Sequence, residues 1–213
     1  MKRVLSIAIV VILLSGSITY AKTESYYQGD EYGESIDELF MRQDDADDSR
    51  VPILDLSHTG SQVIEEIACN TSISARRKAV VIKGMELLRF TKYNLGSKAN
   101  NDRLTKPAYL DCSGFVQWAI LRATGYDIGH GTAVQYSGSR AITEEELQVG
   151  DLGFKKPGGV QNLGGGNHVG IFVGYDKDGN KLWLHCTSGT QNGVNITKHS
   201  GLVYYVRPDC YEN

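Results

Sequence analysis

The chain has 213 residues, ordinary apolar and charged fractions and a formal net charge of −3. This length favours one domain with its own hydrophobic core, and the sequence shows no internal repeat that would indicate a repeat array. From Ser49 onward there are 18 Lys and Arg against 15 Asp and Glu, a mild positive excess that suits an anionic polymer but is not a nucleic-acid-binding signature.

The first residues have the features of a secretory signal. Lys2 and Arg3 form a basic start, residues 4–14 an apolar run, and residues 19–21 an acceptable cleavage site. We therefore expect a signal peptide over residues 1–21 and a secreted protein at the cell wall or extracellular face; an uncleaved membrane anchor is the alternative. No other stretch approaches the roughly 18 apolar residues of a membrane helix, so no stable membrane insertion is expected after cleavage.

Residues 22–70 are predicted to form an acidic, largely disordered spacer. Ten acidic residues lie between Glu24 and Asp48, against the single base Arg42. Such a stretch buries too little apolar surface to order itself. The folded domain is expected over residues 71–213.

Helices come first in that domain. Ser74 is expected to cap a helix that runs to about Phe90, and an irregular connection then leads to a second helix at Cys112. Asp111 is a good N-cap for the second helix, and Gly125 is a suitable stop. Apolar or thiol residues stand at positions 112, 115, 116, 119, 120 and 123, which is the stripe of a helix with one buried face.

Strands follow, after a predicted loop at residues 125–140. They are expected over residues 151–155, 168–175, 181–188, 193–199 and 202–206. This order, with helices first and an antiparallel meander afterwards, is typical of α+β domains. We therefore expect helices packed on a sheet of about five strands. Between Pro157 and Asn167 there are five glycines, and we expect this loop to gate a cleft beside the strand that follows.

Cys112 is the first candidate for chemistry. In the first turn of a helix, the helix dipole and unpaired N–H groups favour the thiolate and lower the thiol pKa from about 8.5. The alternative is a small core residue. Among the other cysteines, Cys69 and Cys210 are a possible disulfide, and alternation along the strand points Cys186 into the core.

Two histidines are candidates for the base that a thiol nucleophile needs. His168 opens one strand directly after the glycine-rich loop, and His185 lies in the next, so the two rings can face each other across neighbouring strands. Each histidine also has a non-catalytic interpretation when it is considered alone. His168 is then an exposed histidine at a strand end, and His185 is a partly buried histidine whose hydrogen bonds are satisfied.

Four blocks of sequence, taken in order, carry a resemblance to a known family. They are Asp111-Cys112-Ser113-Gly114-Phe115-Val116, Leu147-Gln148-Val149-Gly150-Asp151-Leu152, His168-Val169-Gly170-Ile171-Phe172-Val173-Gly174 and Leu184-His185. They resemble the successive motifs of the NlpC family of cell-wall cysteine peptidases, over roughly residues 75–208. The resemblance implies a papain-like domain that hydrolyses an amide bond in peptidoglycan stem peptides, between γ-D-glutamate and the diamino acid.

The resemblance also implies roles for single residues. Cys112 is then the nucleophile, His168 the general base and later acid, and His185 the polar residue that orients the imidazole. The backbone N–H of Cys112 or Ser113 serves as an oxyanion donor. Asp111 matches the aspartate that helps to hold the substrate's free amine.

Two weaker matches extend the candidate substrate site. Tyr93 lies in a Tyr-x-x-Gly segment whose tyrosine lines the active site in the family. Thr132 and Gln135 match a family Ser-x-x-Gln stretch, although His130 stands where an arginine often precedes it.

The implied partner is the stem peptide, with no cofactor, no nucleic acid and a monomeric protein. Because an acidic spacer stands in place of a wall-binding module, intact wall is favoured over free peptides. A zinc site formed by Cys112, His168 and His185 is a rival, although no zinc-type spacing is present. The sequence also leaves open an N-acyl amidase, a thiol acyltransferase or a non-catalytic wall-binding module on the same fold.

Overall fold

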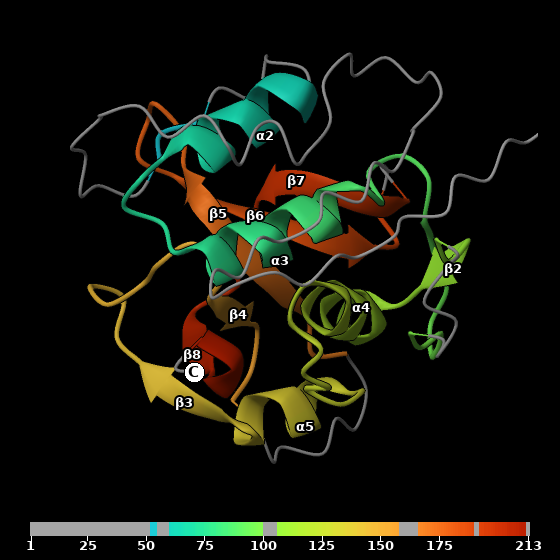
Figure 1. Cartoon of the computed structure of the whole chain (residues 1–213). Helices are drawn as coiled ribbons and strands as arrows, with labels where there is room; N and C mark the ends of the chain where they lie inside the picture. The colour runs from blue at the N-terminus through green and yellow to red at the C-terminus, as the bar shows by residue number, and fades with distance from the viewer. Residues whose placement is uncertain (1–51, 55–59, 100–105, 158–165, 190–191, 212–213) are drawn as a thin grey trace, which may run out of the picture. The chain divides into compact units, whose positions relative to one another are not determined.

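The computed structural model describes residues 52–54, 60–99, 106–157, 166–189 and 192–211 (Figure 1). The helices are α2 (Gly60–Cys69), α3 (Ala75–Met85), α4 (Cys112–Thr124) and α5 (Thr132–Ser137), with a final 3-10 turn η1 (Asp209–Tyr211). The strands are β1 (Lys92–Tyr93), β2 (Tyr109–Leu110), β3 (Ser139–Ile142), β4 (Leu152–Phe154), β5 (Val169–Tyr175), β6 (Lys181–Thr187), β7 (Gly193–Lys198) and β8 (Tyr204–Pro208). The predicted signal peptide and most of the glycine-rich loop lie outside the described residues.

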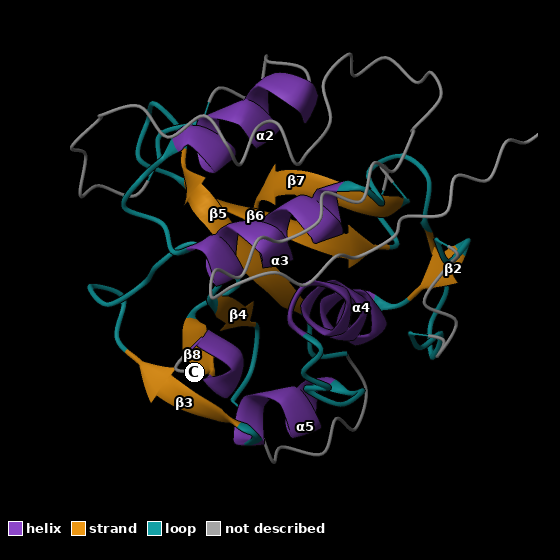
Figure 2. Ribbon diagram, in the orientation of Figure 1, coloured by secondary structure: helices purple, strands orange, loops and turns teal. Residues whose placement is uncertain are grey.

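A six-stranded antiparallel sheet forms the centre of the fold, in the order β3-β8-β4-β5-β6-β7. Helices α3 and α4 contact each other and pack on the sheet at β5 and β6 (Figure 2). The α+β prediction is confirmed, with one strand more than the five predicted. The additional strand is β3, whose first two residues lie in the segment predicted as loop. It is a short edge strand paired with β8, and its side chains are largely exposed.

The buried stripe of α4 is confirmed. Cys112, Phe115, Val116, Ala119 and Ile120 are all buried in the main core. The Asp111 side chain accepts a hydrogen bond from the Gly114 N–H at the N-cap, and Gly125 ends the helix in the left-handed conformation. The first helix is shorter than predicted, because the chain leaves α3 after Met85 and continues as turns to Phe90.

The predicted boundary between spacer and domain is corrected by α2. Residues 60–69 form a helix, and its Val63 and Ile67 lie in the main hydrophobic core. Leu54 is also buried there, so the packed domain begins well before residue 71. Composition did not reveal this, because one short amphipathic helix adds little apolar content to an acidic region.

An isolated parallel bridge joins the segment before α2 to the end of β5. Leu54 N donates to Tyr175 O at 2.7 Å, and Tyr175 N donates to Pro52 O at 3.0 Å. Gly174 makes this contact possible, because a Cβ at that position would lie 2.4 Å from the Pro52 carbonyl oxygen. Its φ of +143° is also one that residues with side chains rarely adopt.

One buried carboxylate ties the helices to the sheet. Asp151 is fully buried before β4, and Arg77 on α3 donates to its Oδ1 at 2.8 Å. Arg207 on β8 donates to both carboxylate oxygens, at 3.0 and 2.7 Å. The aspartate of the second sequence block is therefore a structural residue that links α3, β4 and β8.

No helix within the described residues is both long and apolar enough to cross a membrane. The four cysteines Cys69, Cys112, Cys186 and Cys210 all carry free thiols, so the possible Cys69–Cys210 disulfide is not formed. Cys186 is fully buried with Leu182 and Leu184 in the main core, as the strand alternation predicts.

Candidate active site

Cys112 is the first residue of α4, with its side chain only slightly exposed. A turn at residues 94–97 holds this helix end in place, because Asp111 N donates to Ser97 O at 2.9 Å. The contact requires a glycine at position 114, since a Cβ there would lie 2.3 Å from the same carbonyl oxygen. The glycine of the first sequence block thus lets the turn approach the helix that carries the thiol.

The sulfur of Cys112 also lies against the start of β5. The Val169 N–H, next in the chain after His168, is one of three backbone N–H groups that lower its pKa, with those of Ser113 and Cys112 itself. Burial outweighs them, and together with the Asp111 carboxylate it raises the pKa of Cys112 to about 11. The prediction of a lowered thiol pKa is therefore wrong for the free protein, because it counted the helix end but not desolvation.

His168 and His185 meet as the sequence predicts. Nε2 of His168 lies 2.6 Å from Nδ1 of His185, and Nε2 of His185 lies 2.8 Å from Oγ1 of Thr197 on β7. Each ring has one nitrogen engaged by the next group in this chain of contacts. Because Nε2 of His168 contacts His185, its Nδ1 is the ring nitrogen that lies outside this chain of contacts.

Burial keeps both rings neutral. It lowers the pKa of His168 to about 4 and that of His185 to about 3, and in each case neighbouring positive charge adds to the effect. A neutral imidazole can carry one proton on one nitrogen and accept a proton on the other. The structure therefore presents an uncharged thiol and uncharged rings, a state from which a proton can be taken up by His168.

A third histidine lies in this cluster and was not identified from the sequence. His199 follows β7, and its ring stacks on His168 with centroids 5.4 Å apart, while it meets His185 edge-on at 5.8 Å. Gly201 N donates to its Nδ1 at 3.2 Å, which fixes the ring. Only the pairing of β6 with β7 brings it near His168, and none of the four sequence blocks contains it.

The Asp111 carboxylate accepts hydrogen bonds from several sides. Gly114 N and Ser113 Oγ donate to Oδ1 at 2.7 and 2.9 Å, and Gly96 N donates to Oδ2 at 3.1 Å. His130 Nε2 lies 3.2 and 3.0 Å from the two oxygens. Asp111 thus joins the helix end, the turn before it and the segment after α4, besides its predicted place at the site.

The remaining predicted substrate residues differ in position. Burial, followed by Cys112 and Asp111, raises the pKa of Tyr93, so its hydroxyl lies within electrostatic reach of the Cys112 sulfur. Thr132 begins α5 and is half-buried. Gln135 is fully buried, and its Nε2 donates to the carbonyl oxygens of Ser113 and Gly129 at 2.8 and 2.9 Å.

That arrangement makes Gln135 a link between α5, α4 and the loop between them, and it does not support the predicted substrate contact. The Ser113 side chain is buried as well, and its hydroxyl donates a hydrogen bond to Asp111. The zinc alternative also gains no support, because within the described part of the chain no three His, Cys, Asp or Glu side chains are placed to hold a metal ion.

These features define a class: a papain-like α+β fold with a cysteine at a helix N-terminus and histidines on the adjoining strands. The model of the NlpC/P60 family matches residues 91–208, which is more than half of the chain. The chain belongs to the NlpC/P60 family.

Curated relatives match part of the chain. A "Probable endopeptidase" of Haemophilus influenzae is 36% identical over 85 residues, covering 40% of this chain and 47% of the relative. The "Murein DD-endopeptidase MepS/Murein LD-carboxypeptidase" of Escherichia coli K12 is 31% identical over 88 residues, covering 41% and 40%. The chain thus spans less than half the length of these relatives.

Similar solved structures include the NlpC/p60 domain of the peptidoglycan hydrolase SagA. It is 26% identical, covers 62% of this chain and 97% of its own, and has a TM-score of 0.47. RipD from Mycobacterium tuberculosis, described as a non-catalytic NlpC/p60 domain protein adapted to peptidoglycan binding, is 19% identical, with coverages of 63% and 98% and a TM-score of 0.45.

Proposed function

We propose that this chain is an exported peptidoglycan hydrolase that uses Cys112 to cleave an amide bond in wall stem peptides. The observation that carries the proposal is the line of contacts from His168 through His185 to Thr197. His168 directly precedes Val169, whose N–H contacts the buried sulfur. Membership of the NlpC/P60 family and the endopeptidase names of its relatives support wall peptides as the substrate class.

The mechanism begins with a neutral pair. As Sγ of Cys112 attacks the scissile carbonyl carbon, Nδ1 of His168 accepts the thiol proton. Nε2–H of His168 donates to Nδ1 of His185, and Nε2–H of His185 donates to Oγ1 of Thr197, so the tautomer of each ring is set by the next group. Charge therefore develops during attack and need not exist in the free enzyme.

The second half of the reaction returns the proton. The imidazolium of His168 gives it to the leaving amine, the C–N bond breaks, and a thioester to Cys112 remains. Water then attacks the thioester while His168 accepts its proton, which releases the acid and regenerates the thiol. The N–H groups of Cys112 and Ser113 point at the sulfur, so either is suitably placed to stabilise the oxyanion, a contribution of about 2.7–4 kcal/mol per donor.

We further propose that the cleaved bond joins γ-D-glutamate to the diamino acid, and that the protein acts at the cell wall after export through residues 1–21. The bond is tested by incubating purified wall with the protein and identifying the released muropeptides by mass spectrometry. Cys112→Ala should abolish release, while Cys186→Ala, which removes a thiol from the core beside the site, should retain it.

Each rival function predicts a different product in the same assay. An amidase releases whole stems from the glycan, and an acyltransferase gives adducts with an added amine. A binding module sediments with wall but releases nothing. Release by Cys112→Ala at the wild-type rate would contradict the assigned nucleophile.

A further inference from the structure

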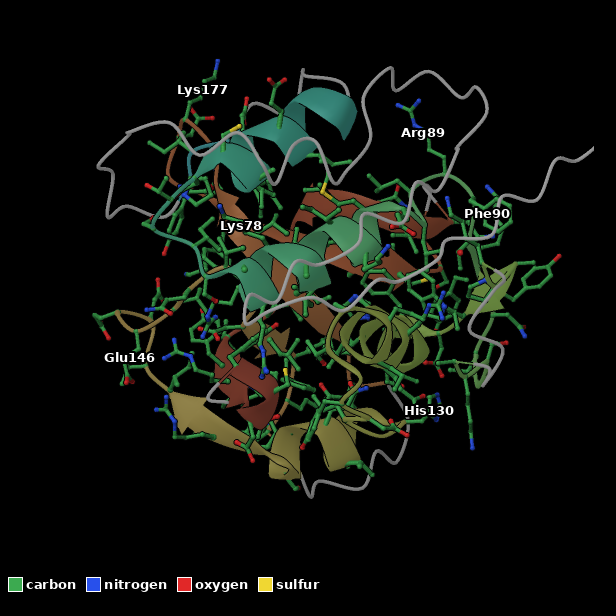
Figure 3. The ribbon with its side chains drawn as sticks, viewed as in Figure 1. Lys78, Arg89, Phe90, His130, Glu146 and Lys177 are labelled. Carbon is green, nitrogen blue, oxygen red and sulfur yellow. The ribbon has the colours of Figure 1, made fainter. Side chains whose placement is uncertain are left out.

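Two free thiols lie in the same part of the core, and the proposed reaction uses only one of them. Cys112 and Cys186 belong to one buried cluster, in the layer of side chains where α4 packs on β5 and β6 (Figure 3). Cys112 retains 7% exposure, whereas Cys186 is fully buried. A small solute can thus reach the first thiol from solvent, while the second is surrounded by protein.

Strand register brings Cys186 to the residue that contacts the Cys112 sulfur. The N–H of Val169 is one of the groups that contact this sulfur. Counting two residues outward along each strand from the pair Ile171 and Leu184 takes β5 to Val169 and β6 to Cys186. Both side chains lie in the main core, so the Cys186 thiol is on the side of the sheet that α4 covers.

A second contact of Cys186 leads back to the same helix end. Its Sγ donates to the Leu110 carbonyl oxygen at 3.4 Å, and Leu110 is two positions before Cys112. Burial raises the pKa of Cys186 to about 12, and the negative charge of a Cys112 thiolate adds to the effect. The register, the hydrogen bond and this charge effect agree that the two thiols are neighbours.

We propose that Cys112 and Cys186 form a reversible modification site, in which hydrogen peroxide oxidises the first thiol and the second captures it as a disulfide. The Cys112 sulfur attacks one peroxide oxygen as its proton leaves, the O–O bond breaks, and a sulfenic acid and one water form. Sγ of Cys186 then attacks the oxidised sulfur, and the S–O bond breaks. The departing hydroxide takes the Cys186 proton as a second water. The peroxide thus accepts the two electrons that the two thiols lose.

The disulfide stops hydrolysis but preserves the nucleophile. A sulfur held in a disulfide cannot attack a carbonyl carbon, so the site is inactive while the bond exists. A lone sulfenic acid is oxidised further to a sulfinic acid, which thiol reductants do not reverse, whereas a disulfide is returned to two thiols by exchange. Cys186 therefore gives the protein a way to recover after contact with an oxidant.

The first test is a peptide map of the wild-type protein after brief treatment with dilute hydrogen peroxide. We expect the peptides that contain Cys112 and Cys186 to be linked, with the loss of two hydrogen atoms, and muropeptide release to stop. Dithiothreitol should separate the peptides and restore release. A wild type that stays fully reduced, or whose Cys112 gains oxygen with no linked peptide, overturns the proposal.

Cys186→Ala removes the capturing thiol and leaves the nucleophile in place. It should release muropeptides before treatment, but after peroxide its Cys112 should reach the sulfinic acid, and dithiothreitol should restore roughly tenfold less activity than in wild type. Cys210→Ala is the matched control, because Cys210 is another buried free thiol, in the turn η1. It should recover as wild type does. Equal recovery in Cys186→Ala and wild type overturns the proposal.

The activity measurements rest on the proposed function, whereas the peptide map does not. A protein that releases no muropeptide before peroxide is added contradicts the proposed function, and the linked peptide still decides the modification site. If Cys186→Ala does not fold, Cys186→Ser replaces it, because a hydroxyl can still donate to the Leu110 carbonyl but cannot form a disulfide. Its recovery is expected to match that given for Cys186→Ala, and recovery equal to wild type would again overturn the proposal.

Discussion

Two buried polar clusters lie beside different strands of the same sheet. They reduce the free-energy cost of burying polar groups in opposite ways. Around Asp151, two guanidinium groups from Arg77 and Arg207 surround one carboxylate, so the buried negative charge is paired with positive charge. Around His168 and His185, burial lowers the pKa of each ring, and the groups stay neutral. The first arrangement links α3, β4 and β8, and the second leaves neutral imidazole rings that can accept a proton.

The largest expected effect is on catalysis at the histidine cluster. His168→Ala should lower kcat by roughly 10²–10⁴-fold, because the proton acceptor is lost. His185→Gln should be milder, on the order of tenfold, because the glutamine oxygen can still accept from His168 and one hydrogen bond is worth about 0.5–1.5 kcal/mol. Steady-state release of muropeptides measures both, and a reversed order would contradict the assigned roles.

The Asp151 cluster should instead respond in stability. Asp151→Ala removes the carboxylate that Arg77 and Arg207 share and should lower the free energy of unfolding by about 3–5 kcal/mol. Asp178→Ala is the control, because its 3.7 Å pair with Lys198 is exposed and should contribute at most about 1 kcal/mol. Urea unfolding at pH 7 compares the two, and equal losses would show that Asp151 does not tie the elements together.

The two clusters should also differ in their response to acid. The folded pKa values of His168 and His185, about 4 and 3, lie below the ordinary 6.5. In this interval the unfolded chain binds more protons, so stability is full above pH 6.5 and is lost as pH falls toward 4. At pH 5 the loss should be on the order of 1–2 kcal/mol per ring.

Urea midpoints at pH 7 and pH 5 test this, with His168→Gln as the comparison. The variant lacks one of the two titrating rings, so its midpoint should fall less between the two pH values. An identical fall in wild type and variant would show that His168 is not buried in its neutral form.

The smallest expected effect concerns His199. Burial lowers the pKa of His168 most, and the charged form of His199 lowers it further. The His199 ring also stacks on that side chain. His199→Phe keeps an aromatic ring but removes the charge, so the pKa of His168 should rise. The acid limb of kcat/KM should therefore move to higher pH, by less than about one unit. His199→Leu removes both the charge and the aromatic ring, so comparing it with His199→Phe separates stacking from charge. If the acid limb of the kcat/KM profile stays at the same pH in both variants, an electrostatic role of His199 is excluded.

Local sequence signals were sufficient for part of the site. Asp111 and Gly125 mark both ends of α4, and alternation along β6 separates His185 from the core-facing Cys186, because capping and strand periodicity act between near neighbours. The pairing of His168 with His185 also followed, since a short hairpin joins their strands.

Signals that depend on the folded chain were missed. The raised pKa of Cys112 comes from burial by residues distant in sequence, and the contact between His130 and Asp111 spans 19 positions through a turn. His199 reaches His168 only through the pairing of β7 with β6. None of these leaves a periodic pattern, so a reading based on periodicity and motifs cannot find them.

The bridge between Pro52–Leu54 and Tyr175 fixes the start of the described domain at one end of β5. His168 directly precedes β5 and Tyr175 ends it, a separation of about 23 Å at the usual rise of an extended strand. The described segment before α2 is thus attached at the end of β5 remote from the thiol.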